Sequence, residues 1–180
     1  MTCIVAFKQN DNTYIAGDML GSDGYSKKLI AQPKVFKNGN LYIGYTTTFR
    51  YGQVLEHVWT PPRHIAQDKS DMRYLVEDVV PSLLSCLKNA NMKELEGHQG
   101  FGECVIVYNK SIYRMQADNS ILPYEDFACC GSGEVSAAAI MEWHTQNGQL
   151  NNSFSVEKLF ETLSKVCVGV SKEHVCIKCE

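Results

Sequence analysis

Strand-like and helix-like segments come in groups along this chain rather than in alternation. Apolar runs typical of strands fill the first 45 residues, and two helical stretches follow. Strand-like runs then return, and two more helices and a short strand complete the sequence. Parallel sheets are built from alternating strands and helices, so this grouping favours antiparallel sheets. We therefore expect a layered α+β fold.

The strand predictions rest on apolar runs joined by short polar turns. Asn38-Gly39 between two such runs is the strongest short-range hairpin signal, and the first two runs of the chain pair most simply as a hairpin. Strands are expected at residues 3–7, 13–18, 34–37, 41–45, 104–108, 112–116, 121–124, 127–130 and 174–177.

Helices are predicted where apolar residues recur at steps of three and four. One such stripe runs from Met72 to Leu87, and Pro81 within it should kink or divide the helix. Ser155 can cap the last helix. Helices are expected at residues 51–59, 70–87, 135–146 and 156–167. There is no linker, repeat or low-complexity segment, so residues 1–180 should form a single domain.

Charge and composition narrow the classes of function. A net charge of −3 gives no electrostatic case for a nucleic-acid partner. No signal peptide or membrane-spanning run is visible, so we expect a soluble, cytoplasmic chain without membrane association. The eight cysteines read as reduced thiols, and the Cys176–Cys179 pair lacks the second pair that a zinc site needs. We expect no metal site and no cofactor.

The start of the chain carries a candidate nucleophile. Initiator methionine is removed when the next side chain is small, so Thr2 is expected to become the free N-terminus after Met1. The hydroxyl of Thr2 would then lie beside an α-amine whose ordinary pKa of about 7.7–8.0 suits a general base. Threonine paired with its own terminal amine is a recognised activated nucleophile.

Two charged residues at regular intervals after Thr2 suggest a larger candidate site. Asp18 lies sixteen residues after Thr2, and Lys34 lies sixteen residues after Asp18. With these intervals, the chain resembles proteasome β-type subunits and the bacterial HslV peptidase, which are N-terminal-nucleophile (Ntn) hydrolases of the threonine type. The resemblance is carried by residues 2–6, 15–18, 34–35, 41–44 and 131–133, the last being a Gly-Ser-Gly turn before an Ala-rich helix.

This resemblance implies a fold and a mechanism. The fold would be a four-layer αββα sandwich of two antiparallel sheets flanked by helices. Thr2 would attack peptide carbonyls through an acyl-enzyme, which makes the chain a threonine-type endopeptidase. Lys34 would lower the proton affinity around the hydroxyl, and Asp18 would keep that lysine charged and oriented. Ser132 would complete the proton relay.

The same resemblance implies how substrate is held. The backbone N–H of Thr48 would be the oxyanion donor, and Thr46 would shape the specificity pocket. An extended peptide would pair with strand edges at Ser22 and Thr48, with Gly21 and Gln32 bordering the pocket. The implied partners are a polypeptide substrate, identical subunits in a homo-oligomeric ring, and an ATPase unfoldase.

Three alternatives stay open. The family usually has glycines in the oxyanion loop, whereas this chain has Thr46-Thr47-Thr48, so it could be a catalytically silent assembly or binding module. It could also use the same nucleophile on a small amide. Cys3 could be the nucleophile if Thr2 were removed as well. The family's second, C-terminal aspartate has no clear counterpart; Ser171 and Glu173 lie in its region without matching it.

Overall fold

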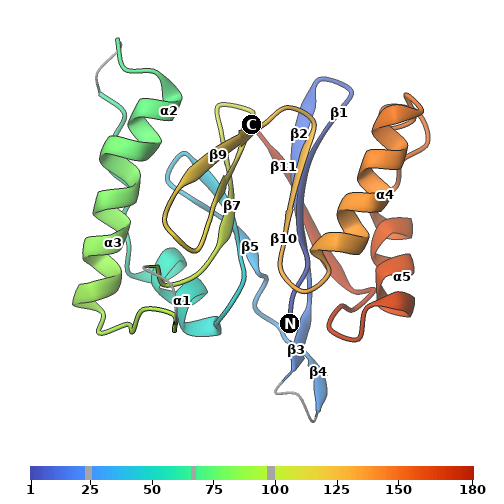
Figure 1. Ribbon diagram of the computed structural model, residues 1–180, viewed down its shortest axis with the longest axis horizontal. Coiled ribbons are helices and arrows are strands. Elements are labelled where there is room, and N and C mark those ends of the chain that lie inside the picture. Colours follow the sequence, from blue (N-terminus) through green and yellow to red (C-terminus); the bar gives the residue numbers. More distant parts are fainter. Residues whose placement is uncertain (23–25, 66–67, 97–99) are drawn as a thin grey trace.

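Two antiparallel sheets lie face to face between two layers of helices (Figure 1). The computed structural model describes residues 1–22, 26–65, 68–96 and 100–180. The predicted αββα sandwich is confirmed. Within the described ranges, no helix combines the length and the apolar character needed to cross a membrane.

The four-stranded sheet contains the two ends of the chain. Its strand order is β10-β1-β2-β11, and every neighbouring pair is antiparallel. The strands are β1 (Ile4–Gln9), β2 (Asn12–Asp18), β10 (Phe127–Cys130) and β11 (His174–Cys179). The predicted first hairpin is confirmed. Its turn uses Asn10 and Asp11 at positive φ, which these two residue types tolerate better than most.

The five-stranded sheet has the order β5-β6-β7-β8-β9 and is also antiparallel. Its strands are β5 (Val35–Asn38), β6 (Leu41–Tyr45), β7 (Cys104–Tyr108), β8 (Ser111–Met115) and β9 (Ile121–Tyr124). Pro123 lies in the edge strand, where a missing N–H costs no ladder bond. A separate two-stranded ribbon, β3 (Leu20–Ser22) with β4 (Lys27–Leu29), extends from one end of the sandwich (Figure 1). The sequence did not predict this ribbon, because its residues carry no apolar alternation.

One helical layer covers each sheet (Figure 1). The five-stranded sheet is covered by α1 (Phe49–His57), α2 (Asp71–Tyr74), η1 (Leu75–Val79) and α3 (Val80–Asn89), and the four-stranded sheet by α4 (Glu134–Gln146) and α5 (Val156–Val166). Pro81 was expected to kink or divide the helix; residues 71–89 remain helical without a break, and the disturbance is a local widening. Proline lacks an N–H and crowds the carbonyl four residues earlier, and the chain widens into the π-helical turn η1 just before it.

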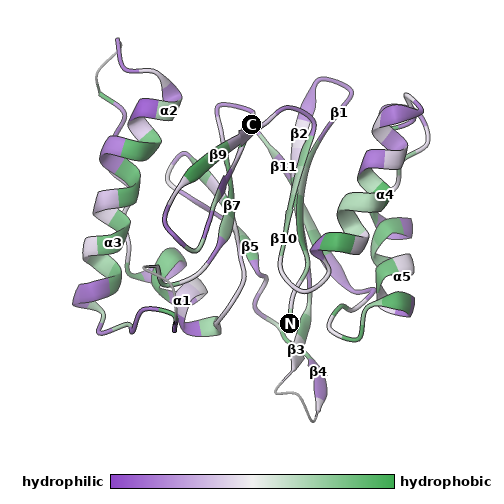
Figure 2. Ribbon diagram, viewed as in Figure 1, coloured by the Kyte–Doolittle hydropathy of each residue, from purple (hydrophilic) through white to green (hydrophobic). Residues whose placement is uncertain are grey.

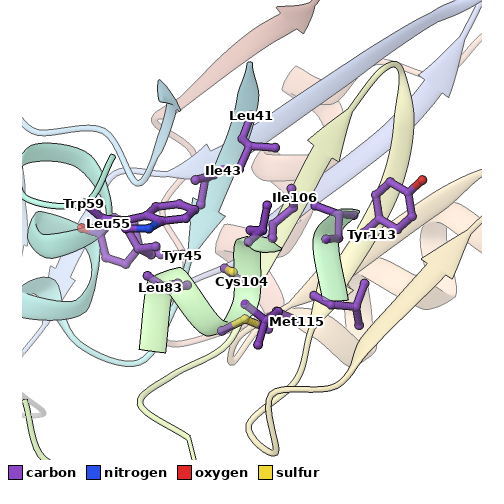
Figure 3. Close-up of a cluster of buried hydrophobic side chains, with 14 of the residues drawn as sticks. Leu41, Ile43, Tyr45, Leu55, Trp59, Leu83, Cys104, Ile106, Tyr113 and Met115 are labelled. Carbon is purple, nitrogen blue, oxygen red and sulfur yellow. The ribbon is translucent and has the colours of Figure 1, made fainter. Parts of the chain in front are cut away.

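The core has three layers that follow the alternation of the strands. On β1, Val5 and Phe7 pack toward α4 and α5, whereas Ile4 and Ala6 pack toward the other sheet. Figure 3 shows the third layer, where Leu41, Ile43 and Ile106 of the five-stranded sheet meet the helices above it. In Figure 2 hydrophobic residues run along the middle of the strands, and hydrophilic residues gather in turns such as the one between β1 and β2.

Candidate active site

The strand register brings the start of the chain to the end of β2. Ile4 pairs with Gly17, so the residue before Ile4 lies beside the residue after Gly17. Cys3 N–H donates to Asp18 Oδ1 at 2.8 Å, and Asp18 N–H donates to the Cys3 carbonyl at 3.2 Å. Lys34, just before β5 of the facing sheet, reaches the same point from the other side. The two sheets therefore meet around Thr2 at the end of the sandwich where Figure 1 marks the N-terminus.

Asp18 and Lys34 form a buried ion pair. Lys34 Nζ lies 3.1 Å from each carboxylate oxygen of Asp18. The carboxylate also accepts bonds from the backbone N–H groups of Cys3 and of Leu20, the latter at 2.9 Å. Burial lowers the pKa of Lys34 because it penalises the ammonium, and Asp18 opposes that shift by attraction and hydrogen bonding. The pair thus places the Lys34 nitrogen inside the protein, directly beside the Asp18 carboxylate.

The candidate nucleophile is held by the residue before it. Thr2 Oγ1 donates to the Met1 carbonyl at 2.6 Å, and Lys34 Nζ donates to the same oxygen at 3.3 Å. One carbonyl oxygen therefore lies within hydrogen-bonding distance of both the hydroxyl and the ammonium. Thr2 N is a peptide nitrogen here, so it cannot act as a base while Met1 is attached. In this state Thr2 Oγ1 and Lys34 Nζ share one acceptor, and Thr2 N is not basic.

The Gly-Ser-Gly turn contacts Thr2 from the opposite side. Thr2 N–H donates to Ser132 Oγ at 3.0 Å, and the Thr2 carbonyl accepts from Ser132 Oγ and from Gly133 N–H, both at 3.2 Å. At Gly131, φ is +96° and an added Cβ would lie 2.4 Å from the Thr2 carbonyl oxygen. Only glycine fits this position. The sequence singled out Ser132, but it did not reveal the close contact made by Gly131.

The loop after β6 contains a strained turn. Thr48 N–H donates to the Thr46 carbonyl at 3.1 Å, and Thr47 between them has φ of +80°. These features define a γ-turn with positive φ, which is rare and strained, especially at a β-branched residue. Thr48 Oγ also accepts from Tyr51 N–H at 3.1 Å and thereby caps α1. The sequence expected Thr48 N–H as the oxyanion donor, and in this conformation that N–H is already engaged.

Two hollows of unequal size flank Thr2, and both also touch Met1, Thr46 and Thr47. The smaller compartment, about 210 Å³, is further lined by Ser22, Tyr45, Thr48 and Phe49. The larger compartment, about 460 Å³, is further lined by Leu95, Glu103, Arg114, Ala117, Gly131, Ser132 and Glu134. Thr46, the residue expected to shape the specificity pocket, thus lines both compartments.

Two of the expected pocket residues do not line either compartment. Gln32 turns its amide to Glu56 Oε2 at 2.7 Å, on α1. Gly21 lies in the ribbon, where an added Cβ would meet Ile30 at 2.7 Å. Its neighbour Ser22 does line the smaller compartment. Of the two expected ribbon residues, Ser22 lines the cleft and Gly21 does not.

Ser171 supports Asp18 indirectly, a role that sequence reasoning left open. Met19 N–H donates to Ser171 Oγ at 3.2 Å and to the Glu173 carbonyl at 2.9 Å, and Ser171 Oγ donates to the same carbonyl at 2.8 Å. Ser171 is 8% exposed. These bonds fix the backbone directly after Asp18. The segment before β11 thus takes part in building the site.

Cys3 does not have the surroundings of a nucleophile. Its side chain is fully buried in the core beneath α4 and α5. Burial raises the pKa of the Cys3 thiol well above its ordinary value, so the thiolate is disfavoured. Its backbone N–H is committed to Asp18. These observations favour Thr2 over Cys3.

Known proteins resemble this chain in structure but not in sequence. No protein-family model and no curated protein matches the sequence. A solved structure of the bacterial proteasome homologue BPH from Thiobacillus denitrificans has a TM-score of 0.76 at 14% identity, covering 99% of this chain and 98% of that one. The same protein in complex with epoxomicin has a TM-score of 0.75 at 14% identity, covering 99% of both chains.

A eukaryotic relative gives the same result. HslV from Trypanosoma brucei has a TM-score of 0.63 at 12% identity and covers 98% of both chains. At such low identity the likeness establishes the fold alone. The chain therefore has the proteasome/HslV-like Ntn-hydrolase fold, which confirms the expectation from the sequence.

Proposed function

We propose that this chain is a threonine-type endopeptidase that uses Thr2 as its nucleophile after Met1 has been removed. The observation that carries the proposal is the meeting of Thr2 Oγ1 and Lys34 Nζ at one carbonyl oxygen, 2.6 and 3.3 Å away. Asp18 holds the ammonium in place, and Ser132 holds the nitrogen of Thr2. In the proposed role, these four residues form the catalytic group.

Removal of Met1 would convert the peptide nitrogen of Thr2 into a basic α-amine. That amine would take the proton from Oγ1 as Oγ1 forms a bond to the substrate carbonyl carbon. It would then give this proton to the leaving amine as the peptide bond breaks, which leaves an ester on Thr2. A water molecule would attack the ester, with its proton passing to the amine and then to Oγ1. The charged Lys34 would stabilise the hydroxyl oxygen as negative charge develops on it.

The oxyanion of each tetrahedral intermediate needs an N–H donor. We assign this role to Thr48 N–H, which requires the γ-turn at Thr47 to open when substrate binds. The positive φ of Thr47 supports this step, because leaving a strained conformation lowers the cost of opening. An extended peptide would pair with the strand edges at Ser22 and Thr48, with Thr46 forming the wall between subsites.

The polypeptide substrate and the assembly follow from the resemblance to proteasome-type peptidases. In the proposed assembly, identical subunits form a ring that encloses the sites, and an ATPase partner supplies unfolded chains. One similar structure is that of Thiobacillus denitrificans BPH in complex with epoxomicin.

One observation favours a second candidate, a silent binding module with the same fold. The hydrogen bond from Thr48 N–H to the Thr46 carbonyl withholds the expected oxyanion donor. In that case the fold and the buried ion pair would persist without turnover.

A cleavage assay on an unfolded protein, with a chain that begins at Thr2, separates the endopeptidase from the silent binding module. The proposal expects peptide fragments from a reduced, carboxymethylated protein substrate, and none from the Thr2→Ala variant. Thr162→Ala, an exposed threonine on α5, is the matched control and should cleave normally. If the chain with a mass-verified Thr2 N-terminus releases no fragments, the binding module is the better account.

A further inference from the structure

The two compartments beside Thr2 differ in charge. Among the residues that the structure describes, none with a charged side chain lines the smaller one. The larger one has three, Glu103, Arg114 and Glu134. A substrate that spans Thr2 would therefore meet a neutral wall on one side and a charged wall on the other.

The charged wall has one cation for two carboxylates. Arg114 Nη2 lies 2.7 Å from Glu103 Oε2 and 3.1 Å from Glu134 Oε2, and its Nη1 also bonds Glu134. The arginine side chain is 13% exposed, whereas those of Glu103 and Glu134 are 29% and 34% exposed. The guanidinium thus lies behind the two carboxylates. The wall has one excess negative charge, and the accessible groups are the acidic ones.

Arg114 also has a structural role between the two sheets. Arg114 is on β8 of one sheet, and its Nη1 also donates to the Cys129 carbonyl on β10 of the other at 3.1 Å. Glu134 is the first residue of α4. The arginine therefore joins the two sheets. Arg114 needs only one carboxylate to form an ion pair. The second carboxylate can therefore pair with another cation.

The chemistry of Thr2 decides which side of the scissile bond faces this wall. The leaving amine must lie near the α-amine of Thr2, which gives it a proton. Thr2 N is bonded to Ser132 Oγ at 3.0 Å, and Ser132 lines the larger compartment but not the smaller. The residue on the leaving side of the bond would therefore enter the larger, charged compartment.

We propose that Glu103 and Glu134 form a specificity subsite that selects lysine or arginine immediately after the scissile bond. This inference rests on the proposed peptidase function and deepens it by naming a class of substrate. A lysine or arginine side chain there would pair with the two carboxylates, whereas an aspartate or glutamate would be repelled. The neutral compartment would hold an uncharged residue on the other side of the bond.

The test uses internally quenched peptides that differ only in the residue after the cleaved bond. The enzyme is the chain whose N-terminus is shown by mass to be Thr2. With lysine, glutamine and glutamate at that position, kcat/KM should fall in this order, with lysine at least about fivefold above glutamine. Added salt should reduce this difference, because the carboxylates are partly exposed. Mass spectrometry of the products verifies the cleaved bond.

Variants assign the preference to the wall. Glu103→Gln, which leaves Glu134 to pair with Arg114, should reduce the lysine-to-glutamine ratio toward one while the glutamine peptide is still cleaved. Glu161→Gln, a solvent-exposed glutamate on α5, is the matched control and should keep the full ratio. Thermal unfolding verifies that Glu103→Gln folds, and the peptide series on the unsubstituted chain tests the charge preference without any variant.

The outcomes separate the two proposals. Equal cleavage of the lysine, glutamine and glutamate peptides overturns the subsite and leaves the peptidase function standing. A lysine preference that persists in full in folded Glu103→Gln also overturns it. Failure to cleave any peptide, together with failure to cleave an unfolded protein, overturns the peptidase function and the subsite with it.

Discussion

Lys34 Nζ lies 3.1 Å from both carboxylate oxygens of Asp18, and the two side chains are 1% and 0% exposed. A charge this deep in a protein is tolerated only with a partner, so neither residue can be removed without stranding the other. The pair also connects the end of β2 to the start of β5. It is therefore a structural tie between the sheets as well as a catalytic element of the proposed site.

Removing one partner of this pair should cost more than removing both. Lys34→Met and Asp18→Asn should each lower the free energy of unfolding by about 3–5 kcal/mol. The double variant should recover much of that loss, because no uncompensated charge remains. Urea unfolding measures these values. Covalent labelling of Thr2 by an epoxyketone peptide probe should be lost in all three variants. A double variant as unstable as the sum of the single ones would contradict the account.

Stability at alkaline pH should carry the signature of Lys34. Burial lowers the pKa of Lys34 below the ordinary value of 10.5. Between the folded and unfolded values the unfolded chain binds the proton and the folded chain does not, so this group makes stability rise with pH there. The cost of burying the ammonium is fully present below the folded pKa and is relieved between the folded and the unfolded pKa. Loss of the proton differs from Lys34→Met, because the neutral amine can still donate a hydrogen bond to Asp18.

The same titration should limit activity. Probe labelling of Thr2 should decline at a pH below 10.5 as Lys34 loses its charge. Urea unfolding at a series of pH values should show the rise in the unsubstituted chain and not in Lys34→Met. Lys165→Met, an exposed lysine on α5, is the control and should keep the rise. An identical pH profile in Lys34→Met and the unsubstituted chain would argue against the assignment.

Gly131→Ala should displace Thr2. The new Cβ would lie 2.4 Å from the Thr2 carbonyl oxygen, in a backbone conformation with φ of +96°. A shift of the nucleophile by about 1 Å can reduce the rate about 100-fold, so we expect labelling of Thr2 to fall by that order. Gly148→Ala is the control, with φ of +63° and nothing within 4 Å of the added Cβ. It should lose about 1 kcal/mol of stability and label normally; equal labelling of both variants would count against the predicted displacement.

Thr47→Gly should make the protein more stable. Relief of the positive φ at a β-branched residue is worth about 1–3 kcal/mol, and the greater entropy of an unfolded glycine offsets about 0.5–1 kcal/mol. We expect a net gain of about 1 kcal/mol in urea unfolding. Thr60→Gly, a loop threonine outside the positive-φ set, should instead lose stability. A loss in both variants would show that the turn at Thr47 is not strained.

The strands and helices were predictable because each rests on a local signal. Alternating or continuous apolar runs marked all strands of the two sheets, and Pro81 marked the region where the long helix widens into a π-helical turn. The ribbon of β3 and β4 escaped prediction, since Lys27–Leu29 is exposed and pairs only with Leu20–Ser22.

The candidate site likewise has features that the sequence predicted and features that it did not. The spacing of Thr2, Asp18 and Lys34 was visible in the sequence, and the structure brings the three together. The γ-turn at Thr47 was not visible, because a strained backbone conformation has no signature in residue type. The cluster around Arg114 left one clue, a charged residue in an otherwise uncharged strand. Its partners could not be inferred, because they come from distant parts of the sequence.

The most direct test of the central claim is the intact mass of the chain after treatment with an epoxyketone peptide. A preparation that begins at Thr2 should gain the mass of one probe, fragmentation should place that mass on Thr2, and Thr2→Ala should gain none. A chain that retains Met1 should also remain unmodified, because the Thr2 nitrogen is then part of the peptide bond to Met1. An unmodified chain with a verified Thr2 N-terminus, or an adduct that persists in Thr2→Ala, would contradict the assignment of Thr2 as the nucleophile.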